Sequence, residues 1–163
     1  MEKYFELLKQ GGSDLAIKID AKTISVAAWT VFKCMYGCPH YGRTHCCPPK
    51  APTWQMTRDM LSCFKYGILF RCHDLKAITP LALKASRELL LDGYYKTIAF
   101  GGGPCTKCEK CNPDYCIHPL EILPSMEACG IDVFATVKAN GLEIGMARDK
   151  DTAINCYGLI MVE

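Results

Sequence analysis

Cysteine stands out in this chain of 163 residues, which contains twelve of them, most gathered in two short segments. The second segment reads GPCTKCEKCNPDYC, with two, two and four residues between successive cysteines. Thiolates are preferred ligands of zinc and of iron–sulfur clusters. The candidate metal ligands of this segment are Cys105, Cys108, Cys111 and Cys116.

The spacing of this second group favours an iron–sulfur cluster. A bacterial ferredoxin run has the form C-x2-C-x2-C-x3-C-P, and here the first three positions match while the fourth lies one residue further on. A spacing of two lets the backbone curl around a cluster so that successive thiolates meet different irons. Gly102 and Gly103 would allow the backbone to approach the cofactor closely. The sequence leaves open whether Cys116 completes this cluster or binds a second one.

Zinc and disulfides are the alternatives for these cysteines. Zinc also accepts four thiolates, but usually from two well-separated C-x2-C pairs. Disulfide frameworks are typical of small secreted proteins, and this N-terminus lacks the long apolar stretch of a signal peptide. We therefore expect one or two [4Fe–4S] clusters, with zinc as the alternative cofactor.

The first group, within residues 34–52, is less regular and is expected to be a loop because it is rich in proline and glycine. Its opening C-x3-C resembles a radical SAM motif, but the next cysteine is too far along the chain for that interpretation. Side chains of adjacent residues diverge, and Pro48-Pro49 stiffens the chain after Cys47, so Cys47 is favoured over Cys46. The candidate ligands of this group are Cys34, Cys38, Cys46 and Cys47.

Three thiolates at the first group would leave one iron open, or held by an outside ligand. His40 and His45 are available in the same segment, although two histidines facing solvent is the simpler interpretation. A complete cluster suits electron transfer to a redox partner protein, whereas an open iron within residues 34–47 would suit an enzyme of sulfur transfer or reductive chemistry. A zinc-stabilised interaction module is the third possibility.

Composition excludes several other functions. The formal net charge of +2 and the lack of a basic run give no indication of nucleic-acid binding. No apolar run approaches the length of a membrane span, and we expect a cytoplasmic protein. Neither a P-loop nor a dinucleotide-binding glycine motif is present. The sequence does not indicate an oligomeric state.

The segments between the cysteine groups alternate between strand-like and helix-like patterns. Thr53, Thr79 followed by Pro80, Ser125 and Asp132 are expected helix caps. Helices are expected at 3–10, 54–64, 79–92, 125–130 and 132–140, and strands at 15–19, 25–33, 66–72, 94–100 and 154–163.

This order of elements predicts a single α/β domain over residues 1–163, a sandwich of a mixed sheet and helices. The two cysteine-rich loops, at about 34–52 and 101–119, would project from it. The last strand is apolar on both faces, as an interior strand is. The cysteines outside the two groups are expected in the core, namely Cys63, Cys72, Cys129 and Cys156.

Several stretches together resemble a family of small predicted metal-binding proteins from anaerobic prokaryotes, the domain of unknown function 2284. They are CPHYG followed by CPP, the GPC-x2-C-x2-C run, and PSMEACGIDVFATV at residues 124–137. The resemblance extends over nearly the whole chain and implies metal binding, without implying an activity. It matches Cys34, Cys38 and Cys47 to a first motif, and Cys46 is additional. The four cysteines of the second segment match a second motif.

Overall fold

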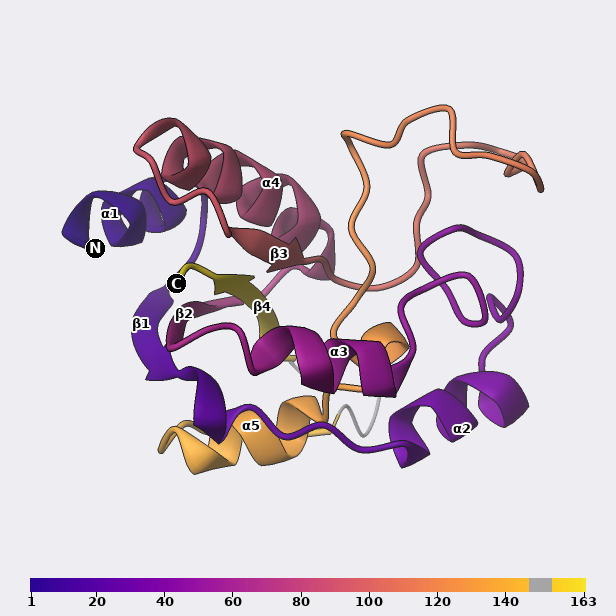
Figure 1. Ribbon diagram of the computed structural model, residues 1–163, viewed down its shortest axis with the longest axis horizontal. Helices are drawn as coiled ribbons and strands as arrows, with labels where there is room; N and C mark the ends of the chain where they lie inside the picture. The colour runs from indigo at the N-terminus through magenta and orange to yellow at the C-terminus, as the bar shows by residue number, and fades with distance from the viewer. Residues whose placement is uncertain (147–153) are drawn as a thin grey trace.

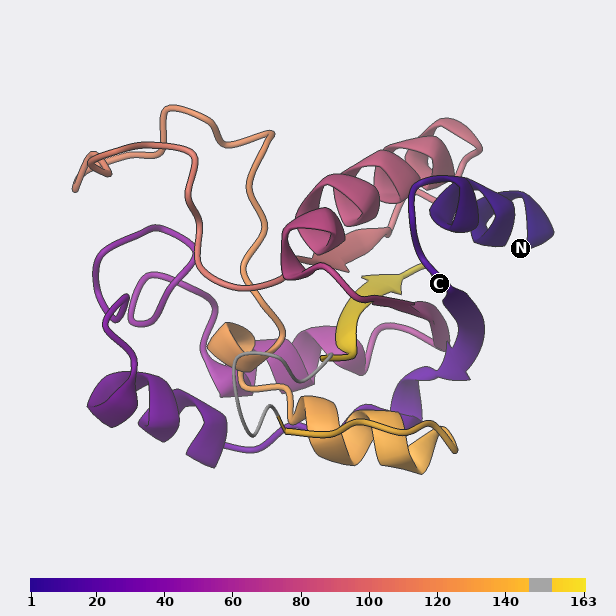
Figure 2. The same ribbon diagram turned by 180° about the vertical axis from the view of Figure 1, so that it is seen from behind.

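A four-stranded sheet lies between two layers of helices in the computed structural model, which describes residues 1–146 and 154–163 (Figures 1 and 2). Each strand runs antiparallel to its neighbours. The strands, in their order across the sheet, are β1 (Leu15–Asp20), β2 (Tyr66–Cys72), β4 (Cys156–Met161) and β3 (Ile98–Phe100). The α/β sandwich is confirmed, but the expectation of a mixed sheet is wrong. β2 and β3 share one direction, with helix α4 crossing between them, but β4 inserts into the sheet and separates them.

Two helices cover each face of the sheet (Figure 1). On one face α1 (Glu2–Gln10) and α4 (Leu75–Leu91) bury an apolar cluster that includes Leu8 and Leu89. On the other face α3 (Trp54–Leu61) and α5 (Val133–Ala139) bury a second cluster. β2 serves both, because Ile68 and Phe70 face the first layer and Leu69 faces the second, all fully buried. The remaining helical elements are η1 (Ala21–Thr23), α2 (Trp29–Gly37) and η2 (Glu127–Cys129).

Most predicted elements are confirmed, with helix ends set by the expected side chains. Thr53 Oγ1 accepts a hydrogen bond from Met56 N at 3.3 Å, and Asp132 Oδ1 accepts one from Ala135 N at 2.9 Å. β4 lies in the interior of the sheet, as its apolar character on both faces predicts.

The predicted strand at residues 25–33 is wrong, because α2 begins at Trp29. Val26 makes a single isolated bridge to Ile131, and Ala27 N donates to Gly130 O. These contacts anchor the segment to the 126–131 turn, outside the sheet. Tertiary pairing therefore overrides the β-propensity of this stretch.

Helix α4 begins at Leu75, before the predicted start at residue 79. Asp74 caps it by accepting a hydrogen bond from Lys76 N at 2.9 Å. Thr79 and Pro80 lie inside α4, and Thr79 Oγ1 instead accepts a hydrogen bond from Gly102 N at 3.1 Å. The strand expected at 94–100 is shortened to β3, because turns occupy the residues before it.

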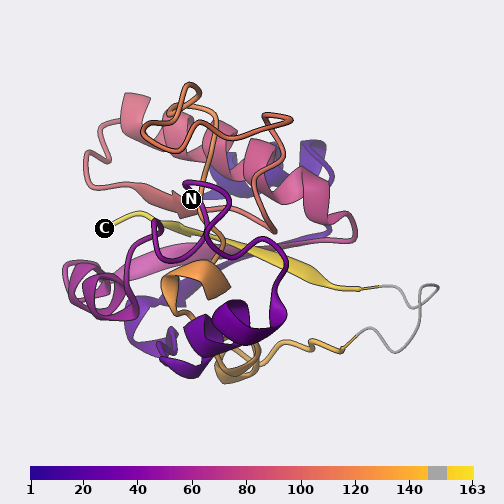
Figure 3. The same ribbon diagram turned by 90° about the vertical axis from the view of Figure 1, so that its right-hand side faces the viewer.

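Both cysteine-rich segments emerge from the same end of the sandwich (Figures 1 and 3). The first follows α2 and leads into α3, and the second joins β3 to η2. Gly101 N donates to Pro124 O at 2.8 Å, so the two ends of the second segment are pinned together where it leaves the sheet.

Replacing Gly130 with alanine should lower the free energy of unfolding by about 2–5 kcal/mol. Gly130 has a φ of 88°, and an added Cβ would lie 2.3 Å from the Cβ of Trp54, the first residue of α3 after the first cysteine segment. Gly141 is the matched control, since its φ is 72° but its Cβ would meet nothing within 4 Å. Gly141→Ala should cost only about 1–2 kcal/mol. Equal losses in urea denaturation would show that the contact with Trp54 contributes nothing.

Candidate metal centre

The first cysteine group begins on a helix rather than in a loop. Cys34 belongs to α2, and Cys38 directly follows its last residue. Residues four apart lie on the same side of a helix, so α2 presents these two thiols together. Cys46 and Cys47 follow in the loop, which is closed by a hydrogen bond of 2.8 Å from Gly42 N to Pro48 O. Both of these cysteines are buried.

The four cysteines of the second group line one small cavity, about 20 Å³ in volume. Two side chains of the first segment, Thr44 and His45, complete its wall. His118 N donates a hydrogen bond of 3.4 Å to Cys116 Sγ, the kind of amide contact that stabilises a metal-bound thiolate. A segment with little secondary structure thus places its four cysteines in the wall of the same cavity.

The two cysteine segments are held against each other (Figure 3). His45 Nε2 donates to Asn112 O at 2.8 Å, and Lys50 Nζ donates to Pro113 O at 2.5 Å. The predicted solvent-facing position of the histidines is therefore wrong. His45 bridges the two segments, and His40 is half-buried.

The thiols of both groups influence one another, and Cys105 of the second group is near both Cys46 and Cys47. Burial, followed by the neighbouring Cys105 thiol, raises the pKa of Cys46 to about 12. Burial also raises the pKa of Cys47, with Cys38, Cys105 and Cys111 contributing.

At the other end of this set, burial and then Cys38 and Cys47 raise the pKa of Cys34. Glu127 of η2 adds to that increase, so its carboxylate is near Cys34. A metal that binds these thiols would replace their protons and supply the positive charge that their thiolates otherwise lack. The donor chemistry of this set therefore fits a thiolate-bound metal or cluster.

Thr44 lies in the wall of the thiol cavity. Its hydroxyl acts against the effect of burial and lowers the pKa of Cys47, so it is placed to stabilise that thiolate. Across residues 1–146 and 154–163, no three His, Cys, Asp or Glu side chains are gathered closely enough for a single metal ion. Metal binding is therefore expected to draw these side chains together.

Sequence reasoning did not identify the polar neighbours of the thiols. His118 lies two residues after Cys116, and this proximity is the one feature of the sequence that could have indicated its contact with the thiol. Nothing in the sequence indicates that Lys50 reaches Pro113 or that Glu127 lies beside Cys34, because these partners are far apart along the chain.

Gly102 and Gly103, predicted as cofactor contacts, lie beside α4. An added Cβ at Gly102 would lie 2.8 Å from Ile78 Cβ, and one at Gly103 would lie 3.1 Å from Leu75 Cδ2. Both glycines line a cavity next to the thiols, and neither is among the residues that line the thiol cavity itself.

The cysteines outside the two groups have varied surroundings. Cys72 and Cys129 are buried as predicted, and Cys156 is half-buried. Cys63 is exposed, so its predicted core position is wrong. α3 ends at Leu61, and Cys63 lies in the turn beyond the amphipathic face.

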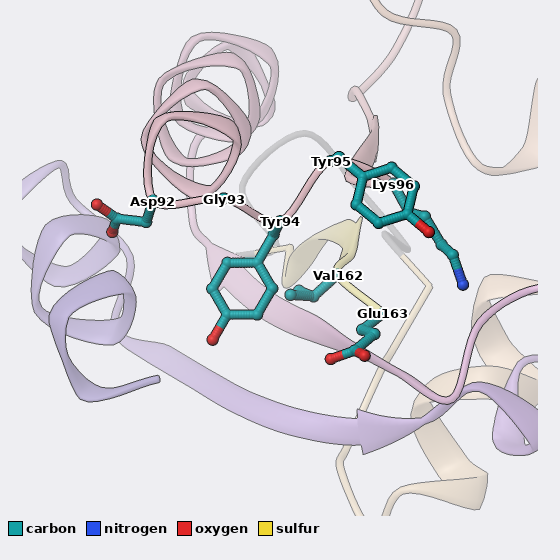
Figure 4. A pocket seen from close by; sticks show the side chains of 7 residues that line it. All are labelled: Asp92, Gly93, Tyr94, Tyr95, Lys96, Val162 and Glu163. Carbon is teal, nitrogen blue, oxygen red and sulfur yellow. The ribbon is translucent and has the colours of Figure 1, made fainter.

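A separate pocket of about 260 Å³ lies beside the C-terminus (Figure 4). The carboxylates of Asp92 and Glu163 lie on opposite sides of the Tyr94 ring and do not converge (Figure 4). Asp92 is already occupied by Lys3 and by the Tyr4 hydroxyl, at 2.6 and 2.7 Å. This pocket contains no cysteine and gives no indication of a metal site.

Among the described residues, no helix has both the length and the apolar character needed to cross a bilayer. No curated protein and no solved structure matches the chain significantly. The profile of one protein family, described as "Predicted metal-binding protein (DUF2284)", matches residues 17–162, a range that includes every cysteine of both groups. The chain therefore belongs to the DUF2284 family of predicted metal-binding proteins.

Proposed function

We propose that the protein binds iron–sulfur clusters and passes electrons to a partner protein. The observation that carries this proposal is the convergence of Cys105, Cys108, Cys111 and Cys116 on one cavity. These four thiolates would hold a [4Fe–4S] cluster, because their spacing lets each one reach a different iron. Such a cluster, when bound, takes up and releases single electrons.

The surroundings of the second group suit this role. The His118 amide donates toward Cys116 Sγ, and such hydrogen bonds favour the reduced, more negative state. Lys107 and Lys110 lie on the exposed part of the segment and would offset the negative charge of four thiolates. Cys108 lies between these exposed residues, so a redox partner would approach the cluster from this side.

A second site at the first group would use Cys34, Cys38 and Cys47, since Cys38 adds to the effect of burial in raising the pKa of both Cys34 and Cys47. Cys47 is also near Cys105 and Cys111, and Cys46 is near Cys105 and Cys116, so the two sites would adjoin. Three thiolates leave one position of a cluster for another ligand. That position would be filled by a further side chain or would be open to substrate, as an enzyme requires.

Anaerobically purified protein should be brown, with broad visible absorption that bleaches on reduction with dithionite. Iron and acid-labile sulfide should each be present at about four to eight atoms per chain, for one or two clusters. A colourless protein with stoichiometric zinc and no sulfide would overturn the proposal in favour of a zinc module. Perturbation of the EPR spectrum by cyanide or added thiol would identify an open iron and support the enzymatic alternative.

A further inference from the structure

A cavity of about 560 Å³ lies between α4 and the second cysteine segment. Pockets for small organic ligands typically have volumes of about 300–1,000 Å³ and mostly apolar walls. The apolar wall residues here come from α4 and from the last part of the second cysteine segment: Leu75, Pro80, Leu83, Leu120, Ile122 and Leu123. The cavity thus has the size and lining of a site for an organic molecule.

The polar groups of this cavity indicate what charge a bound molecule would carry. Lys107 Nζ is paired with Glu121 at 2.7 Å, and the Thr79 hydroxyl already accepts the hydrogen bond of Gly102 N. Lys76 lines the same cavity, and its ammonium group has no carboxylate partner within the described part of the chain. An apolar cavity with one available cation at its rim is complementary to an apolar molecule that carries a negative charge.

This cavity shares a wall with the thiol cavity. Cys105, Lys107 and Ile122 line both. A molecule bound beside α4 would therefore be separated by single side chains from whatever the four thiolates hold.

We propose that this cavity binds an organic carboxylate with an apolar body, next to the metal centre. Leu83 and its neighbours would enclose the apolar body, and Lys76 would pair with the carboxylate. The proximity to a metal centre rests on the proposed function, whereas the binding site itself does not. The inference gives the protein a ligand class that neither its cysteine motifs nor its family description contains.

The test uses the full chain purified anaerobically, with 2-naphthoate as the probe and calorimetry in low salt. Its neutral analogue, 2-naphthalenemethanol, separates apolar from charge recognition. Lys76→Gln should weaken 2-naphthoate binding about fivefold and leave binding of the alcohol unchanged, since an exposed ion pair contributes up to about 1 kcal/mol. Lys84→Gln is the matched control, because Lys84 lies on the same helix, is exposed and does not line the cavity. It should change neither affinity.

Leu83→Trp should narrow the cavity and weaken binding of both probes while the iron content stays that of the unmodified protein. Binding that Leu83→Trp leaves unchanged, or that Lys76→Gln and Lys84→Gln weaken equally, would overturn the inference. Absence of binding in protein with its full iron content would overturn it and leave the proposed function intact. Conversely, protein that lacks iron but binds 2-naphthoate in the expected Lys76-dependent way would support this site and contradict the proposed function.

Discussion

Replacing Cys108 with serine should lower the iron content of the anaerobically purified protein by about four atoms per chain, the content of one [4Fe–4S] cluster. Cys108 lines the small cavity with the other three thiols of its group, and burial followed by Cys111 and Cys105 raises its pKa. A serine hydroxyl is a far poorer ligand for iron than a thiolate. Sulfide should fall in parallel, and the reduced EPR signal of that cluster should disappear.

Cys63→Ser is the control for this experiment. It also removes one thiol, but Cys63 is exposed in the turn after α3 and lies outside both groups. Its iron and sulfide should equal those of the unmodified protein. If Cys108→Ser retained full iron, the assignment of the second group as a cluster site would be wrong. If Cys63→Ser lost as much iron as Cys108→Ser, the loss would reflect handling of the protein rather than its ligands.

The second large effect is a difference in iron content between two variants, Cys46→Ser and Cys47→Ser, each of which removes one thiol of an adjacent pair. Cys47→Ser should remove the iron of the first group, because Cys47 is near Cys38 and Cys34, as well as Cys105 and Cys111. Cys46→Ser should leave that iron in place, because Cys47 is the only thiol of the first group that adds to the effect of burial in raising the pKa of Cys46, and the other such thiols are Cys105 and Cys116. Both positions are buried, so a hydroxyl is introduced into similar surroundings in each variant.

Iron analysis and EPR of the reduced protein would measure the cluster content of the two variants. Circular dichroism would show whether both keep the same fold. Equal iron losses would contradict the division of the thiols into one set of three and one set of four. Loss of iron in Cys46→Ser alone would reverse the assignment of the two residues. Unchanged iron in both variants would limit the protein to the cluster of the second group.

Much of the fold was predictable because its signals are local. The apolar runs of β2 and β4 and the caps at Thr53 and Asp132 are all signals carried by near neighbours in the sequence. The errors arose where a distant contact decided the outcome. Val26 and Ala27 bond to the 130–131 turn instead of joining the sheet, and Thr79 bonds to Gly102 instead of starting a helix.

By itself, the sequence determined which residues can bind a metal, since ligand chemistry depends on side-chain type and the x2 spacing acts over a few residues. Only the tertiary structure decided how the two groups relate. His45 and Lys50 join the first segment to Asn112 and Pro113, more than sixty residues away, and Cys46 lies near Cys105 of the second group. Such contacts depend on where the sheet and α4 direct the two segments, and spacing along a chain carries no information about that.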